Sequence, residues 1–113
     1  MKPIGAVILA FAMAFSLPAA AECSDYPTEA RAEYVFACMQ TNGETPDSLR
    51  RCSCSIDVIA SLLAYDKYVA AQTVASMNQV QGQIGTMFRA SEQSKTMLAE
   101  LHRAQAEAEV RCF

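Results

Sequence analysis

Residues 45–63 read TPDSLRRCSCSIDVIASLL, and this stretch decides the fold that the sequence predicts. Thr45 suits the N-cap of a helix, Pro46 its first turn, and Asp47 the neighbourhood of its positive end. The apolar residues that follow recur at steps of three and four, which is the period of a helix. They form one stripe of Leu49, Cys52, Ile56, Ile59 and Leu63, and a second of Val58, Leu62 and Tyr65 with Cys54. A helix that is apolar on two sides is predicted to lie between two partners.

The segment before this helix, residues 28–42, is predicted to form the first helix. Its apolar residues repeat at spacings of four and give one stripe. The members are Ala30, Tyr34 and Cys38, with Val35 and Met39 beside them. Asn42-Gly43 then supplies the left-handed residue that commonly closes a helix.

Two more helices are predicted after residue 63. Asp66 is expected to cap a third helix that reaches about Val80, with Val69, Val74, Met77 and Val80 facing inward. Gly82 and Gly85 are expected to break or bend it. The last helix is expected to start at Thr86 or Ser91 and to run close to Cys112. Its inward residues, Met97, Leu101, Ala104 and Ala108, step by four, three and four, and the small ones allow close approach of a neighbour.

The fold class follows from these periods. The sequence has no alternating strand pattern bounded by hairpin turns. The predicted fold is therefore all-α, a small disulfide-linked antiparallel bundle of three to four helices.

The N-terminus has the three parts of a secretory signal peptide. Lys2 is followed by an apolar run from Ile4 to Leu17 and by small residues at Ala19 and Ala21. The run is too short to span a bilayer, which needs about 20 residues. We therefore expect residues 1–21 to be a signal peptide and residues 22–113 to be a single disulfide-stabilised domain. An uncut membrane anchor and a lipoprotein are the alternatives, and Glu22 before Cys23 argues against the second.

The charge of the expected mature domain argues against two classes of partner. The chain has nine basic and twelve acidic side chains, and loss of Lys2 leaves eight basic ones. A nucleic-acid-binding domain usually carries a clustered basic face. The mild negative balance therefore argues against nucleic acid, and also against an anionic membrane surface.

All five cysteines lie in the expected mature domain, and in an exported protein the default for cysteine is a disulfide. Cys52 and Cys54 are two positions apart, so on a helix their sulfurs point roughly 200° from each other. Each is expected to bridge to a different segment. Cys38 and Cys52 lie at similar depth on the first helical hairpin and are the expected first pair. Cys54–Cys112 is the expected second pair, although four cysteines allow three connectivities.

Cys23 is expected to be the odd cysteine, as a free or intermolecular thiol that can join two copies of the chain or a partner. It lies one residue from the expected new N-terminus, where a bridge would add little rigidity. The competing possibility is that Cys23 bridges to Cys112 or Cys54 and leaves a buried thiol elsewhere.

No catalytic or cofactor motif is present. The spacing Cys-x-x-Cys of thioredoxin-type redox centres and the Cys-x-x-Cys-His of c-type haem attachment are both absent. His102 is the single histidine, and with Met97 and Cys112 it has no spacing that specifies a copper site. Asp57, inside an apolar stretch, would need a partner such as Arg50, Arg51 or Arg89 if it were buried. Otherwise it reaches solvent. We expect no catalytic residues, no cofactor and no metal.

Four strings resemble a family of small, exported, cysteine-rich helical bacterial proteins, and the resemblance covers nearly all of residues 22–113. The strings are Tyr34-Val35-Phe36-Ala37-Cys38-Met39, Asn42-Gly43, Cys52-Ser53-Cys54-Ser55-Ile56-Asp57 and Tyr65-Asp66-Lys67-Tyr68-Val69. Members look like companions of periplasmic alcohol-oxidising quinoprotein systems. The resemblance implies a periplasmic location in a Gram-negative bacterium, and it supplies no catalytic residues.

Two functions follow as hypotheses. The first is a non-catalytic periplasmic binding or assembly module that docks on a protein partner, such as a quinoprotein dehydrogenase or an electron carrier. The second is a thiol-redox or copper-handling protein that uses Cys52, Cys54 and a free cysteine. An enzyme is the least favoured class, because nothing resembles a nucleophile elbow or a paired acid and base.

Overall fold

The computed structural model of this protein describes residues 25–113. The expected signal peptide and Cys23 lie outside the described residues. The described chain consists of five helices: α1 (Thr28–Asn42), α2 (Pro46–Leu62), α3 (Tyr65–Asn78), α4 (Gln83–Ala90) and α5 (Glu92–Cys112). The all-α prediction is confirmed, with five helices in place of the three to four expected.

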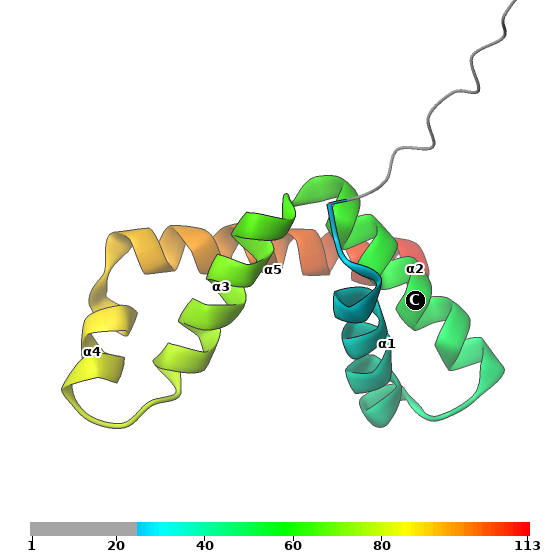
Figure 1. Cartoon of the computed structure of the whole chain (residues 1–113), viewed down its shortest axis with the longest axis horizontal. Coiled ribbons are helices and arrows are strands. Elements are labelled where there is room, and N and C mark those ends of the chain that lie inside the picture. Colours follow the sequence, from blue (N-terminus) through cyan, green and yellow to red (C-terminus); the bar gives the residue numbers. More distant parts are fainter. Residues whose placement is uncertain (1–24) are drawn as a thin grey trace, which may run out of the picture.

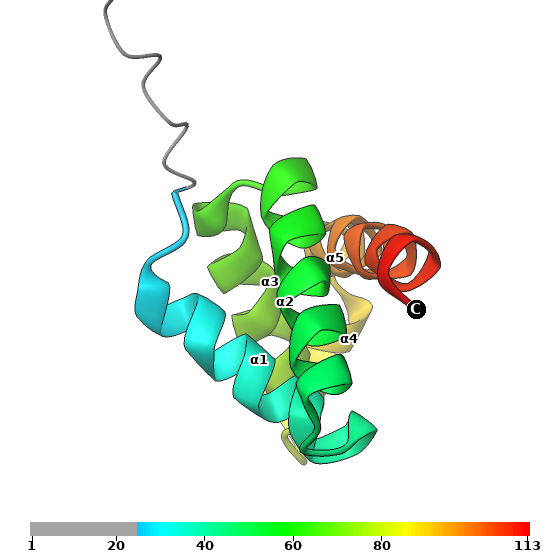
Figure 2. The same cartoon turned by 90° about the vertical axis from the view of Figure 1, so that its right-hand side faces the viewer.

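The helices form two hairpins that lie on one long helix. α1 packs against α2, α3 packs against α4, and both hairpins pack against α5 (Figure 1). The turns of the two hairpins lie on the same side of α5, and a short connection joins α2 to α3 at the other side (Figures 1 and 2). The antiparallel bundle is thus split into two arms.

The helix ends follow the predicted caps with one exception. The Thr45 side chain accepts a hydrogen bond from the Ser48 N–H, and the Ser91 side chain accepts one from the Ser94 N–H. Gly43 closes α1 with a φ of 102°, and its N–H donates to the Met39 carbonyl. The expected cap at Asp66 is wrong. Ala64 is the N-cap of α3, and Asp66 lies in the first turn, where its carboxylate still favours the positive helix end.

The helix that the sequence did not predict as a separate element is α4. Gly82, with a φ of 92°, precedes it, and Gly85 lies buried inside it. A Cβ atom on Gly85 would lie 1.8 Å from the Val80 carbonyl oxygen, so the glycine permits the chain to return closely on itself. Arg89 then donates to the carbonyl oxygens of Asn78, at 2.7 Å, and Val80, at 3.4 Å.

The core lies where α2, α3 and α5 meet. The fully buried residues Ile56 and Ile59 of α2 pack with Leu101 and with Ala104 of α5, as the predicted stripes required. The small residues of α5 allow the two helices to approach closely. The prediction that α2 lies between two partners is confirmed, since α1 covers one side and α5 another. Leu49 and Leu62, also predicted in these stripes, are instead about half exposed.

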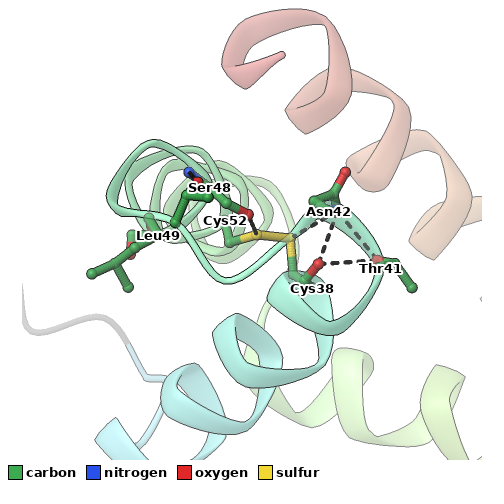
Figure 3. The surroundings of a disulfide bond; sticks show 8 residues. Cys38, Thr41, Asn42, Ser48, Leu49 and Cys52 are labelled. Atoms are coloured by element: carbon green, nitrogen blue, oxygen red, sulfur yellow. Dashed lines mark hydrogen bonds between the residues drawn. A yellow bond between two sulfur atoms is a disulfide. The ribbon is translucent and has the colours of Figure 1, made fainter.

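Two disulfides fasten α2 to its neighbours, and they join the pairs expected from the sequence. Cys38–Cys52 links α1 to α2 across 14 positions, and Cys54–Cys112 links α2 to the end of α5 across 58 positions. Figure 3 shows the first bridge near the hairpin turn, where the Asn42 side-chain amide donates to the Cys38 carbonyl oxygen at 2.9 Å. The Cys52 sulfur is fully buried, and the Ser48 hydroxyl lies 3.9 Å from it.

Candidate binding groove

A groove of about 740 Å³ separates α1 from α3, and we call it the α1–α3 groove. The two helices converge near the α2–α3 connection and diverge toward the hairpin turns (Figure 1). Residues spaced three or four apart line each wall: Ala30, Glu33, Tyr34, Ala37, Cys38, Thr41 and Asn42 from α1, and Tyr65, Tyr68, Val69, Gln72, Thr73 and Ser76 from α3. Ser55 of α2, Gln105 and Glu109 of α5, and Phe113 complete the lining. One face of each wall helix is thus turned toward the other across open space.

Three tyrosines hold the two walls together at the narrow end. The Tyr26 ring, just before α1, lies 5.1 Å from the Tyr65 ring and 5.2 Å from the Tyr68 ring, measured between centroids. The Tyr26 hydroxyl donates to the Leu63 carbonyl oxygen at the end of α2, at 2.8 Å. Burial raises the pKa of Tyr26 to about 12, so this hydroxyl stays protonated throughout the neutral range. The cluster sets where the groove begins.

Two further hydroxyls line the base of the groove. Burial raises the pKa of Tyr34, while a hydrogen bond with the Ser55 side chain partly opposes the increase. Burial also raises the pKa of Tyr68, partly opposed by a hydrogen bond with Gln72. The nearby Tyr68 phenol further raises the pKa of Tyr34. Both therefore remain neutral hydroxyls that can take part in hydrogen bonds.

Two carboxylates give the groove a negative charge. Glu109 acts electrostatically on the Tyr34 phenol, and Glu33 acts on the Tyr68 phenol, so each carboxylate lies within electrostatic range of a tyrosine of the groove. Both glutamates are exposed. Within residues 25–113, neither lysine nor arginine contributes to the lining. The groove thus presents negative charge that no basic side chain of its own lining offsets.

The wall formed by α1 corrects the sequence prediction. The stripe of Ala30, Tyr34 and Cys38 was predicted as one apolar stripe of the first helix, yet none of the residues of α1 is fully buried. On the opposite wall Val69, expected inward, is 43% exposed. The pattern located the correct helix face, but that face is only partly covered: Tyr34 packs against the core and Cys38 is bonded to Cys52, while both residues also line the groove. The polar residues of α3 at the same spacing, Gln72 and Ser76, were the signal that could have indicated an open face.

The predicted disulfide residues serve the groove as supports. Cys38 lines the groove directly and is fixed to Cys52 behind it. Phe113 also lines the groove, and its neighbour Cys112 is fixed to Cys54. Each bridge therefore anchors one part of the lining to α2. The Arg51 guanidinium lies 5.8 Å from the centre of the Phe113 ring and adds a cation–π contact.

The two cysteines named in the thiol-redox and metal hypothesis, Cys52 and Cys54, are both in disulfides. Cys112 is bonded to Cys54, and Cys52 is fully buried, whereas reactive cysteines are partly exposed. In the described part of the chain, no group of three or more histidine, cysteine or acidic side chains could hold a metal. The two cysteines named as alternative partners of Cys23 are joined to each other.

Asp57 has a partner that sequence reasoning did not name. Its carboxylate pairs with the Arg31 guanidinium of α1, and not with Arg50, Arg51 or Arg89. The Asp57 side chain is 67% exposed, so this is a surface contact across the α1–α2 interface. Arg31 also lies 5.9 Å from the centre of the Tyr26 ring. The pair helps to orient α1 against α2.

Comparison with family profiles, with characterised proteins and with solved structures gave no significant match for this chain. The helices within residues 25–113 include none that is long and apolar enough to cross a membrane. The assignment of a functional site therefore rests on the geometry of the α1–α3 groove.

Proposed function

We propose that this protein is a non-catalytic binding or assembly module that docks on a protein partner through the α1–α3 groove. The observation that carries the proposal is the open face of α1, a 15-residue helix with no fully buried residue that faces α3 across a 740 Å³ space. Helices of small globular proteins normally bury one face. A helix face left open and supported from behind by a disulfide suits a surface that a partner covers.

The shape of the groove favours a protein over a small molecule. Small-molecule sites usually enclose most of the ligand surface. Here the wall residues Ala37, Val69 and Thr73 are exposed, so a small ligand would remain largely in solvent. A helix, about 10–12 Å wide with its side chains, would instead contact both walls toward the narrow end of the groove (Figure 1). Helix-in-groove recognition uses anchors at helical spacing, which is the spacing of the lining residues.

The proposed location is an oxidising compartment, the periplasm, after export and removal of residues 1–21. The two disulfides suit such a compartment. The apolar segment and the Ala19-x-Ala21 sequence support export. A quinoprotein dehydrogenase or an electron carrier of that compartment is the kind of partner that the family resemblance suggests.

A photo-crosslinking pair tests the docking surface. Benzoylphenylalanine would replace Thr73, which lines the groove, or Thr96, an exposed threonine of α5 outside it. The two are matched, because each hydroxyl donates to the carbonyl four residues before it, at 2.9 and 3.0 Å. Irradiation of producing cells is expected to give a protein adduct from position 73 only. Equal adducts from both positions, or none from position 73, would contradict the proposal.

A further inference from the structure

The α1–α3 groove has a chemistry that selects among protein partners. Its two charged lining residues are Glu33 on α1 and Glu109 on α5. They approach the base of the groove from different helices, since Glu33 lies near Tyr68 and Glu109 lies near Tyr34. Any helix that enters the groove passes these carboxylates. Burying them against an apolar or acidic surface would be costly, because a desolvated carboxylate needs a partner.

The neighbouring side chains match a long basic residue. The tyrosine hydroxyls of the base can accept hydrogen bonds from an ammonium or guanidinium group, which carries donors only. The alanines of the α1 wall, Ala30 and Ala37, leave room for the aliphatic stem of such a residue. Lysine and arginine place that stem on apolar surface while the charged end reaches polar groups. The groove therefore offers apolar surface for the stem of a lysine or arginine and polar partners for its charged end.

We infer that the occupant of the α1–α3 groove is an amphipathic helix of a partner protein, with lysine or arginine side chains that pair with Glu33 and Glu109. This inference rests on the proposed docking function and names the chemistry of the partner. The wall helix α1 has 15 residues and is about 22 Å long, which corresponds to about four turns of a partner helix. Small and apolar residues of that helix would lie between Ala37 and Val69.

Two synthetic peptides test the charge. Both are 18-residue helices with a leucine and alanine stripe, one flanked by lysine and the other by glutamate, and each carries fluorescein for anisotropy measurements. The protein is expected to bind the lysine peptide at least tenfold more tightly than the glutamate peptide. Rising salt is expected to weaken binding of the lysine peptide, because exposed charge pairs are screened.

A pair of double variants locates the effect. The double variant Glu33→Gln with Glu109→Gln is expected to bind the lysine peptide about fivefold more weakly, since two exposed charge pairs are lost. Glu92→Gln with Glu100→Gln removes the same charge from exposed positions of α5 outside the groove and is expected to leave binding unchanged. Circular dichroism of all variants confirms that the helices persist.

Three results would overturn the inference: no binding of the lysine peptide, equal binding of the two peptides, or equal loss in the two double variants. The crosslinking pair separates this failure from failure of the docking function. If position 73 gives an adduct but the two peptides bind equally, the docking surface is supported and a basic partner is rejected. Absence of the adduct rejects the docking surface itself.

Discussion

The α1–α2 hairpin and the α3–α4 hairpin both lie against α5, but they are closed by different chemistry. The first is fastened by Cys38–Cys52 and tied to α5 by Cys54–Cys112. The second has neither bridge, and its turn depends on the close return of the chain at Gly85 and on the donors of Arg89. The arm that carries the exposed groove wall α1 is thus the covalently fastened one. An open face needs support from behind when no core covers it.

The comparison predicts first that the two disulfides contribute differently to the free energy of unfolding. Replacing Cys54 and Cys112 by alanine is expected to lower the free energy of unfolding by about 4 kcal/mol, because the loop between them is long. Replacing Cys38 and Cys52 is expected to cost about 3 kcal/mol, since that loop spans 14 positions. Urea denaturation of the two double variants measures both values. A greater loss from the shorter loop would mean that the bridges act through native packing and not through the unfolded chain.

The unbridged arm is expected to be sensitive at its glycine. Gly85→Ala places a Cβ against the Val80 carbonyl oxygen and is expected to cost about 2 kcal/mol through the backbone shift that it forces. Gly43→Ala has open space around it and is expected to cost only about 1 kcal/mol, through its positive φ.

Hydrogen exchange locates the Gly85→Ala effect. Faster exchange is expected in α4 and at the end of α3, with α1 and α2 unchanged. Uniformly faster exchange along the whole chain would show that the two arms unfold as one unit, against the comparison.

The last expected effect concerns the tyrosine that joins the arms at the narrow end of the groove. Burial raises the pKa of Tyr26 to about 12, above its value of 10 in the unfolded chain, so folding favours the protonated phenol. Its stabilising contribution is complete below pH 10 and is lost as the pH rises to 12, by roughly 1–2 kcal/mol. Tyr26→Phe is expected to reduce this alkaline loss. It is also expected to cost about 1 kcal/mol at neutral pH, because the bond to the Leu63 carbonyl oxygen disappears. An unchanged alkaline loss in the variant would assign it to other groups.

Local spacing was sufficient for α1, α2, α3 and α5 and for the cap at Thr45. The pairs Cys38–Cys52 and Cys54–Cys112 were the expected ones, but spacing alone still allowed three connectivities. It was insufficient for the groove. Periodicity identifies an apolar face, but Ala30 and Tyr34 have the same spacing whether α3 packs on them or stands away from them. The separation of the walls depends on Tyr26, Tyr65 and Tyr68, which converge only after α2 has reversed the chain. The sequence predicted a break or bend at Gly85, but the close approach of Gly85 to the Val80 carbonyl oxygen depends on three-dimensional structure.

The two half-cystines of α2 have a consequence for biosynthesis. Cys52 and Cys54 are two positions apart, so both thiols can compete for Cys38 in an oxidising compartment, whereas Cys112 lies 58 positions after Cys54. Once α2 has formed, Cys54 points about 200° away from Cys52 and thus away from α1. Formation of this single helix therefore favours the pairing of Cys38 with Cys52 and leaves Cys54 for Cys112.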